Sequence, residues 1–183
     1  MDLTKDRKKL KELYQPTTKT FSLVEVPELP FAMIDGSSPP DKEAIQDATK
    51  ALFTTIYPIR REARNRMGKA FVEPPLEIVY WADDMGALQA GSKEDWNWRV
   101  MVTLPVWVDQ AMFKDGVATA ESVIENLPDS LRMERFAEGE CAQIMHIGRV
   151  EEIANTLEQL YSQFLPQHGL EPAGAYHEIY LDD

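Results

Sequence analysis

The chain has 183 residues, of which 44% are hydrophobic and 27% charged, values typical of a soluble globular protein with a full core. Its 31 acidic and 19 basic residues give a net charge of -12. Such a surface disfavours binding to nucleic acid or to anionic membranes, and it suits neutral or cationic ligands. The length fits one domain or two small fused halves.

Cysteine usage and the N-terminal residues bear on the compartment. Cys141 is the single cysteine, which excludes an internal disulfide and fits a reducing cytosol. The basic residues near the N-terminus are not followed by an apolar segment, so no signal peptide is expected. No stretch approaches the ~18 consecutive apolar residues of a membrane span. We therefore expect a soluble, cytoplasmic protein.

The first elements in chain order are a short helix and a broken strand. Residues 2–14 predict a charged helix that Pro16 terminates. The following segment, "FSLVEVPELPFAMIDG", contains two apolar runs interrupted by Pro27 and Pro30. Because proline cannot donate to a strand ladder, this pattern predicts an edge strand with a bulge or kink.

A long helix and two strands come next. Pro39 and Pro40 are placed to open the helix. Pro58 predicts a kink or break near Tyr57. The segments "PPLEIVYWADD" and "DWNWRVMVTLPVWV" predict strands, joined by the loop "MGALQAGSKE". The apolar face of the helix is expected to consist of Ile45, Ala48, Leu52, Ile56 and Ile59.

The second half shows the same order of elements. A helix is expected over 108–126, weakened in its middle by Gly116, and then a strand pair or one bulged strand over 131–148. A second amphipathic helix follows over 151–169, and "AYHEIYLDD" predicts the last strand. Alternation in that strand places Tyr176, Glu178 and Tyr180 on one face. A carboxylate between two aromatic rings needs a partner, unless the strand is a solvent-facing edge.

An internal repeat would explain the shared order. The strands "EIVY" (77–80) and "EIYL" (178–181) match without gaps. The expected halves are 19–106 and 107–183, after a charged lead over 1–18. If the repeat is real, Glu77 and Glu178 are pseudo-symmetric and point toward one central groove.

Five segments occur in this order along the chain: "FAMIDG", "PPLEIVYWADD", "WNWRVMVTLP", "FAEGECAQIMHIG" and "HEIYLDD". In residue type and order they resemble the GyrI-like small-molecule-binding family, and the resemblance covers 21–183. It implies an α+β domain over 19–183, built from two pseudo-twofold-related strand-helix-strand-strand repeats. These would form an antiparallel sheet with helices on one side and a central ligand groove.

The resemblance also implies a function. Regulators of the family bind bulky, flat, often cationic drugs and meet the ligand's charge with a buried glutamate on the final strand, which corresponds here to Glu178. Some stand-alone members hydrolyse the strained cyclopropane of DNA-alkylating cyclopropanoid natural products. The hypotheses are therefore a drug-binding module, a cyclopropanoid hydrolase and, less favoured because the chain is acidic, the effector-binding partner of a transcriptional regulator.

The candidate residues follow from these hypotheses. We expect Glu178, assisted by the hydroxyl of Tyr57, to be catalytic if water is activated. Trp81 and Trp98 are expected to face one another across the groove, and Glu77 to be either a groove carboxylate or a structural one. Met33 and Met101 are expected either to line the groove or to pack in the core. The expected ligand-binding residues are Glu77, Tyr80, Trp81, Trp98, Met145, Tyr176 and Tyr180.

Other kinds of site are not favoured. His146 and His177 do not stand in a metal-ligand motif with Cys141, and isolated glycines do not form a phosphate loop. No cofactor or metal is expected. The expected partner is a small molecule, without nucleic acid or membrane, bound by a monomer or homodimer.

Overall fold

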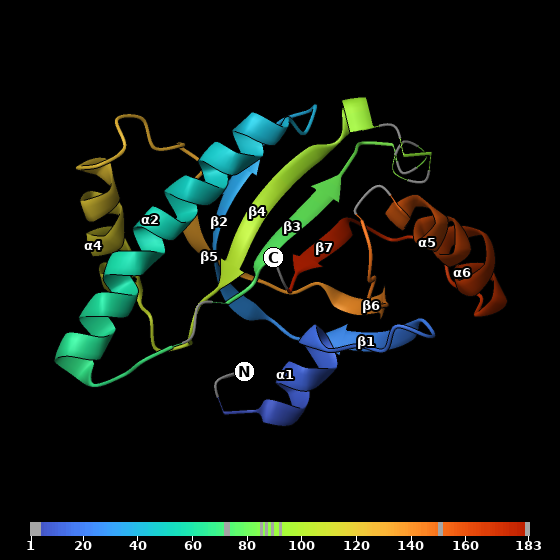
Figure 1. The fold of residues 1–183 in the computed structure, drawn as a ribbon, viewed down its shortest axis with the longest axis horizontal. Coiled ribbons are helices and arrows are strands. Elements are labelled where there is room, and N and C mark those ends of the chain that lie inside the picture. The colour runs from blue at the N-terminus through green and yellow to red at the C-terminus, as the bar shows by residue number, and fades with distance from the viewer. Residues whose placement is uncertain are drawn as a thin grey trace.

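Five segments rich in β-branched and aromatic residues pair into one antiparallel sheet (Figure 1). The computed structural model describes residues 5–71, 74–84, 86, 88, 90, 91, 93–149 and 152–181. The expected helix start at Asp2 lies outside these residues, as does part of the loop before β4. The strand order is β5 (Arg132–Phe136), β2 (Leu29–Gly36), β4 (Asn97–Thr103), β3 (Leu76–Trp81) and β7 (Tyr176–Tyr180).

The two proline-flanked runs belong to different sheets. β1 (Ser22–Val26) pairs with β6 (Gly139–Gln143) in a separate two-stranded sheet, whereas β2 lies between β5 and β4. The prediction of an edge strand is therefore wrong for β2. Pro30 is tolerated because it lies near the start of the strand, where its carbonyl accepts a hydrogen bond from the Leu104 N–H. The segment 131–148, expected to be a strand pair or one bulged strand, contains two strands, β5 and β6, but they pair with β2 and β1 rather than with each other.

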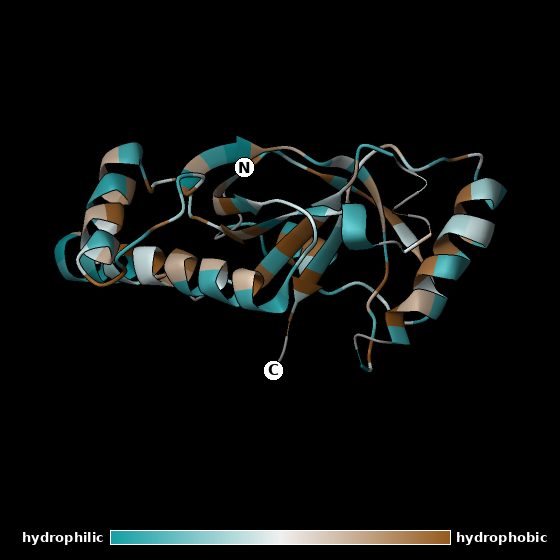
Figure 2. Cartoon of the chain, turned by 90° about the horizontal axis from the view of Figure 1, so that it is seen from above, coloured by the Kyte–Doolittle hydropathy of each residue, from teal (hydrophilic) through white to brown (hydrophobic). Residues whose placement is uncertain are grey.

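Helix α2 (Lys42–Met67) crosses one face of the large sheet. Its N-cap is Asp41, whose side chain accepts a hydrogen bond from the Ala44 N–H, and its C-cap is Gly68 in the left-handed conformation. Figure 2 shows hydrophilic and hydrophobic residues alternating along it, as expected of a helix with one apolar face. The helix continues through Pro58, so a break near Tyr57 is wrong. Ile56 and Ile59 are buried on either side of the proline, and this packing stabilises the helical backbone.

The remaining helices are arranged around the two sheets. α4 (Gln110–Glu121) packs against α2, and α1 (Arg7–Tyr14) lies near β1. The last helical segment consists of α5 (Ile153–Gln159), a π-helical turn (Leu160–Phe164) and α6 (Leu165–Gln167), and lies beyond β7 in Figure 1. A short 3-10 turn, Lys93–Asp95, precedes β4. The chain is thus an α+β protein with antiparallel sheets, as predicted.

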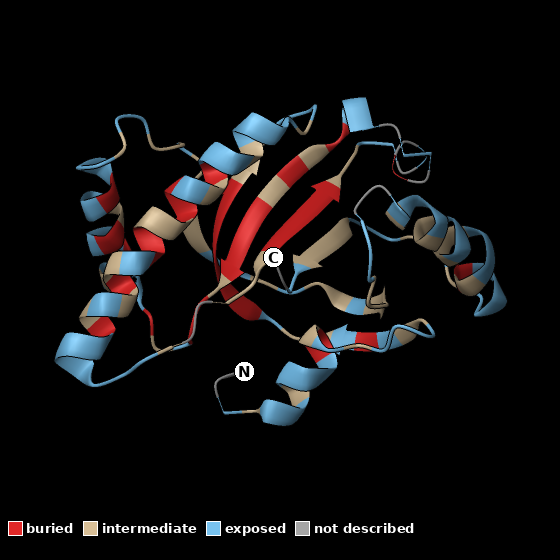
Figure 3. Cartoon of the chain, viewed as in Figure 1, coloured by how far each residue is buried: buried red, intermediate tan, exposed pale blue. Residues whose placement is uncertain are grey.

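Two hydrophobic cores lie on opposite faces of the large sheet. The first joins α2 and α4 to the sheet side chains that face them, among them Ile34, Ile78 and Val100. The second joins Leu13 of α1 and Val24 of β1 to Met33, Val79 and Met101. In Figure 3 the central strands are buried, whereas β7 is only partly covered. No helix among the described residues is long and apolar enough to cross a membrane.

Gly116 allows α2 and α4 to approach closely, rather than merely weakening α4. A Cβ atom at this position would lie 2.6 Å from the Thr55 carbonyl oxygen and 2.9 Å from Ile59. We expect Gly116→Ala to destabilise the protein by about 1–3 kcal/mol, because overpacking forces the two helices apart. Urea unfolding measures this change. Gly174→Ala is the matched control, since no atom lies within 4 Å of its added Cβ. Equal stability of the two variants would contradict the close packing.

Candidate functional site

Glu178 points to the same side of the sheet as α2. β7 pairs with β3 so that Glu178 lies opposite Ile78, and Tyr176 lies opposite Tyr80. Ile78 and Tyr80 belong to the core beneath α2. Because side chains alternate along a strand, Tyr176, Glu178 and Tyr180 share this face, as the sequence predicts.

The carboxylate of Glu178 is held by two tyrosine hydroxyls. Tyr176 donates to Oε1 at 2.6 Å, and Tyr180 donates to Oε2. The Tyr80 ring is stacked on the Tyr176 ring, with centroids 5.8 Å apart. Trp96 lies edge-on to Tyr176 at 6.0 Å and tilted to Tyr80 at 5.5 Å. We call Tyr80, Trp96, Tyr176, Glu178 and Tyr180 the tyrosine cluster.

The tyrosines of this cluster remain protonated. Burial raises the pKa of Tyr176 above its ordinary value, and the negative charge of Glu178 raises it further. The same two causes raise the pKa of Tyr80, and burial together with the hydrogen bond to Glu178 raises that of Tyr180. Each hydroxyl is thus a stable donor. A carboxylate has about four acceptor positions, so Glu178 keeps acceptor capacity for a cation or a water molecule.

The side chains of the tyrosine cluster differ in how far they are exposed to solvent. Tyr80 is 8% exposed and Trp96 2%, whereas Tyr180 is 36% exposed. Tyr176 and Glu178 are half-buried. Two surface depressions lie elsewhere in the described part of the chain. One is lined by β2 and the first half of α2, and the other lies between α2 and α4. The cluster is therefore a partly accessible sheet surface with an apolar floor.

Glu77 does not share this surface, so the expectation that it faces one groove with Glu178 is wrong. In the antiparallel register Glu77 lies opposite Ile179, and Ile78 lies opposite Glu178. The two glutamates therefore point to opposite faces of the sheet. Glu77 is 2% exposed, and its Oε1 accepts a hydrogen bond of 2.7 Å from Tyr14. Among the two interpretations left open by the sequence, the contacts favour the structural carboxylate.

The two tryptophans also lie on opposite faces. Trp98 lies opposite Tyr80, but Trp81 lies opposite Asn97 on the other side. The Trp98 ring fills the space beside Gly36, where a Cβ would lie 2.0 Å from a ring carbon, and its N–H donates to the Ser37 carbonyl. Trp81 lies beneath the guanidinium of Arg99, 5.4 Å from the ring centroid. They cannot face one another across a groove, because strand alternation separates them.

The other predicted residues are not joined to the tyrosine cluster. Tyr57 is 64% exposed and lines the depression between α2 and α4, because it lies on the face of α2 turned away from the sheet. Met33 and Met101 are fully buried in the second core. Met145 follows β6, and its N–H donates to the Thr17 carbonyl. His146 is half-buried, and no group of three His, Cys, Asp or Glu side chains among the described residues is arranged to hold a metal ion.

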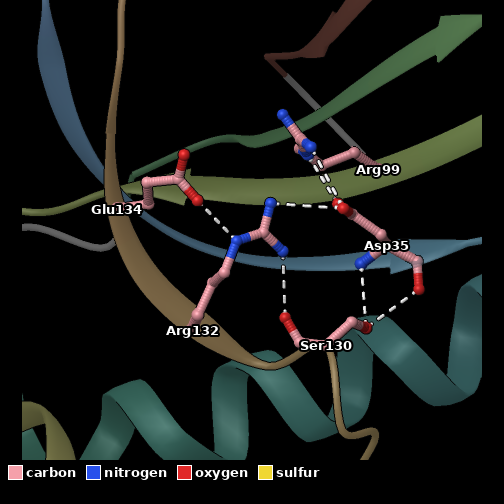
Figure 4. Close-up of polar contacts among 5 residues, drawn as sticks. All are labelled: Asp35, Arg99, Ser130, Arg132 and Glu134. Atoms are coloured by element: carbon pink, nitrogen blue, oxygen red, sulfur yellow. Dashed lines mark hydrogen bonds and ion pairs between the residues drawn. The ribbon is translucent and has the colours of Figure 1, made fainter.

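Sequence patterns did not reveal a charged network at the end of β2 (Figure 4). The Asp35 carboxylate accepts hydrogen bonds from Arg99 Nε at 2.5 Å and from Arg132 at 3.2 Å. The Asp35 N–H donates to the Ser130 hydroxyl, which in turn donates to the Asp35 carbonyl. Burial raises the pKa of Asp35, but the hydrogen bonds and charges of the two arginines outweigh it, so the pKa lies below its ordinary value. Arg132 also donates to Glu134. The charges of the two arginines balance those of the two carboxylates, which favours a structural role that links β2, β4 and β5.

The antiparallel sheets and the helices packed on them define an α+β domain. A family profile for the GyrI-like small molecule binding domain matches residues 19–183, and the chain belongs to this family. This confirms the resemblance carried by the segments from "FAMIDG" to "HEIYLDD". No curated protein matches the chain.

Three similar solved structures come from Listeria innocua. An uncharacterized conserved protein is 30% identical with a TM-score of 0.82, over 97% of this chain and 89% of its own. A hydrolase is 29% identical with a TM-score of 0.77, over 97% and 93%. A hydrolase encoded by lin2189 is also 29% identical with a TM-score of 0.77, over 97% and 89%.

Proposed function

We propose that the tyrosine cluster binds flat, cationic small molecules, with the carboxylate of Glu178 as the counter-charge. The observation that carries this proposal is the pair of hydroxyl donors on the two oxygens of Glu178. They hold a carboxylate in one orientation on a partly exposed aromatic surface. A cation at this surface would replace water around Glu178 without any rearrangement of the strand.

Ring stacking and charge would act together on such a ligand. A cation over an aromatic ring gains about 0.5–2 kcal/mol, and flat rings stack well on tyrosine. The net charge of -12 adds long-range attraction for cations. Because these contributions do not depend on one ligand shape, the surface suits varied ligands rather than a single one.

Hydrolysis of a cyclopropanoid is a second candidate function. Two of the similar structures are hydrolases, and in this candidate function Glu178 would accept a proton from water. In such a step, the water oxygen bonds to a cyclopropane carbon while the strained C–C bond breaks. The electron pair of that bond passes to a conjugated acceptor group, which takes up a proton, and the product is the substrate plus one water. The hydroxyl of Tyr180 or Tyr176, rather than that of Tyr57, lies beside the carboxylate.

Two measurements test these functions. An acridine-type cation is expected to bind with micromolar affinity, roughly -8 kcal/mol, and an uncharged isostere more weakly. Equal affinities for the two dyes would contradict a role for charge. Mass spectrometry after incubation with a cyclopropanoid shows a product heavier by one water only if the chain is a hydrolase. Binding without this mass change identifies a drug-sequestering or sensing module.

A further inference from the structure

A second polar cluster lies directly behind Glu178, on the opposite face of the sheet. The ring of His177 is placed between two carboxylates: Nδ1 is 2.8 Å from Glu138 Oε2, and Nε2 is 3.0 Å from Glu77 Oε2. Tyr14 donates to the other oxygen of Glu77 at 2.7 Å. We call Tyr14, Glu77, Glu138 and His177 the histidine clamp. Its members come from α1, β3, the β5–β6 turn and β7.

Its geometry defines the charge of the ring. A neutral imidazole has one N–H donor, whereas both ring nitrogens of His177 face carboxylates, so the imidazolium is favoured. Burial lowers the pKa of His177, but the hydrogen bond to Glu138 and the negative charges of Glu138 and Glu77 outweigh this and raise it to about 10. Burial and the charge of Glu77 also raise the pKa of Tyr14, which stays a donor. The clamp is therefore a buried cation held by two anions.

The clamp acts on a strand that is otherwise weakly held. Among the described residues β7 is an edge strand of the large sheet that pairs with β3, and it has five residues. His177 precedes Glu178, so its ring and the carboxylate project from opposite faces of one strand. A shift of the register by one residue would move Glu178, together with Tyr176 and Tyr180, to the face of Glu77, and would move His177 to the face of Tyr80. The ion pairs with Glu77 and Glu138 oppose that shift.

We propose that His177 is a positioning residue: through Glu77 and Glu138 it locks the register of β7 that presents Glu178 to the ligand. This inference rests on the proposed function of Glu178. Helix α1, which lies outside the matched residues 19–183, would then support the histidine clamp. Leu13 is 5% exposed in the second core, and Tyr14 donates a hydrogen bond to Glu77. α1 thus covers the histidine clamp on the side of the sheet opposite the proposed ligand.

A double-mutant cycle with Glu178 tests the inference in the full chain. We expect His177→Gln to weaken the acridine-type cation about 10-fold and its uncharged isostere less, because the isostere loses only ring contacts with Tyr176 and Tyr180. In the Glu178→Gln background the same change should cause a smaller loss of cation affinity, because the charge that His177 positions is already absent. His168→Gln is the matched control: this histidine is exposed, its ring contacts the carbonyl and the ring of Phe164 in its own helical segment, and the substitution should leave both dyes unaffected.

A second variant and a measurement without ligand keep the role of His177 testable if His177→Gln does not fold. Glu138→Gln removes one partner of the ring at a turn, and we expect the same selective loss of cation affinity, about a few-fold. Hydrogen exchange of the β7 amides should accelerate in both variants but not in His168→Gln. Equal losses for both dyes, or effects that add fully to those of Glu178→Gln, would show that His177 is only structural. If Glu178→Gln itself leaves cation affinity unchanged, the proposed function fails and the inference falls with it.

Discussion

Glu178→Gln is expected to lower the affinity for a cationic dye by about 1–3 kcal/mol, roughly 10-fold to 100-fold. Glutamine keeps the shape of the side chain and accepts through one oxygen, but it carries no charge and cannot take a proton. The bonds from Tyr176 and Tyr180 then need one donor to turn away, because the amide NH2 cannot accept. Binding of an uncharged isostere should change little. Fluorescence titration of the two dyes measures the difference.

The same variant separates binding from chemistry. If the chain hydrolyses cyclopropanoids with Glu178 as general base, turnover should fall by about 10²- to 10⁴-fold while an uncharged ligand is still bound. Glu171→Gln is a control with the same loss of charge at an exposed position outside the cluster. Full activity and unchanged cation affinity in Glu178→Gln, together with a large loss of stability, would assign Glu178 a structural role.

Glu77→Gln should have the largest effect on folding. Glu77 is 2% exposed and lies 3.0 Å from the His177 ring, so the substitution leaves a buried imidazolium with only Glu138 as a charged partner. Breaking a buried pair in this way costs about 3–5 kcal/mol. Glu28→Gln is the matched control, because its ion pair with Arg135 is exposed and removal should cost less than about 1 kcal/mol. Urea unfolding compares the two, and equal stabilities would contradict the clamp.

The clamp also predicts how stability depends on pH. The pKa of His177 is about 10 in the folded chain and 6.5 in its ordinary state, so the folded protein binds the proton more tightly. Its contribution is fully present below pH 6.5 and is lost as the pH rises toward 10. At about 1.4 kcal/mol for each unit between the two pKa values, the loss amounts to several kcal/mol at most. Glu77→Gln should flatten this decline, and an equally steep decline in the variant would exclude His177 as its source.

Periodicity and residue type were sufficient for most elements and for one face of the site. Alternation in "AYHEIYLDD" correctly placed Tyr176, Glu178 and Tyr180 together, because residues two apart in a strand share a face whatever that strand pairs with. The 3.6-residue spacing of Ala48, Leu52 and Ile56 correctly predicted the buried face of α2. Local patterns of this kind are set by backbone geometry alone.

Proline and glycine signals were less decisive. Pro58 did not end α2 and Pro30 did not place β2 at an edge, because burial of neighbouring side chains stabilised both elements. Gly116, which intrinsic helix propensity marks as a weak point, is the position at which α4 contacts the backbone of α2. In each case the contacts between elements outweighed a local preference of about 1–3 kcal/mol.

The sequence by itself determined the fold class, the family and the carboxylate between tyrosines, since these depend on residues close together in the chain. Only the tertiary structure decided which strands are neighbours and in which register they pair. That register sends Glu77 and Glu178 to opposite faces, separates Trp81 from Trp98, and brings Tyr14 and Glu138 to the ring of His177. A shift of one residue in an antiparallel pair exchanges the two faces of a strand, and nothing in the sequence of a single strand specifies its partner.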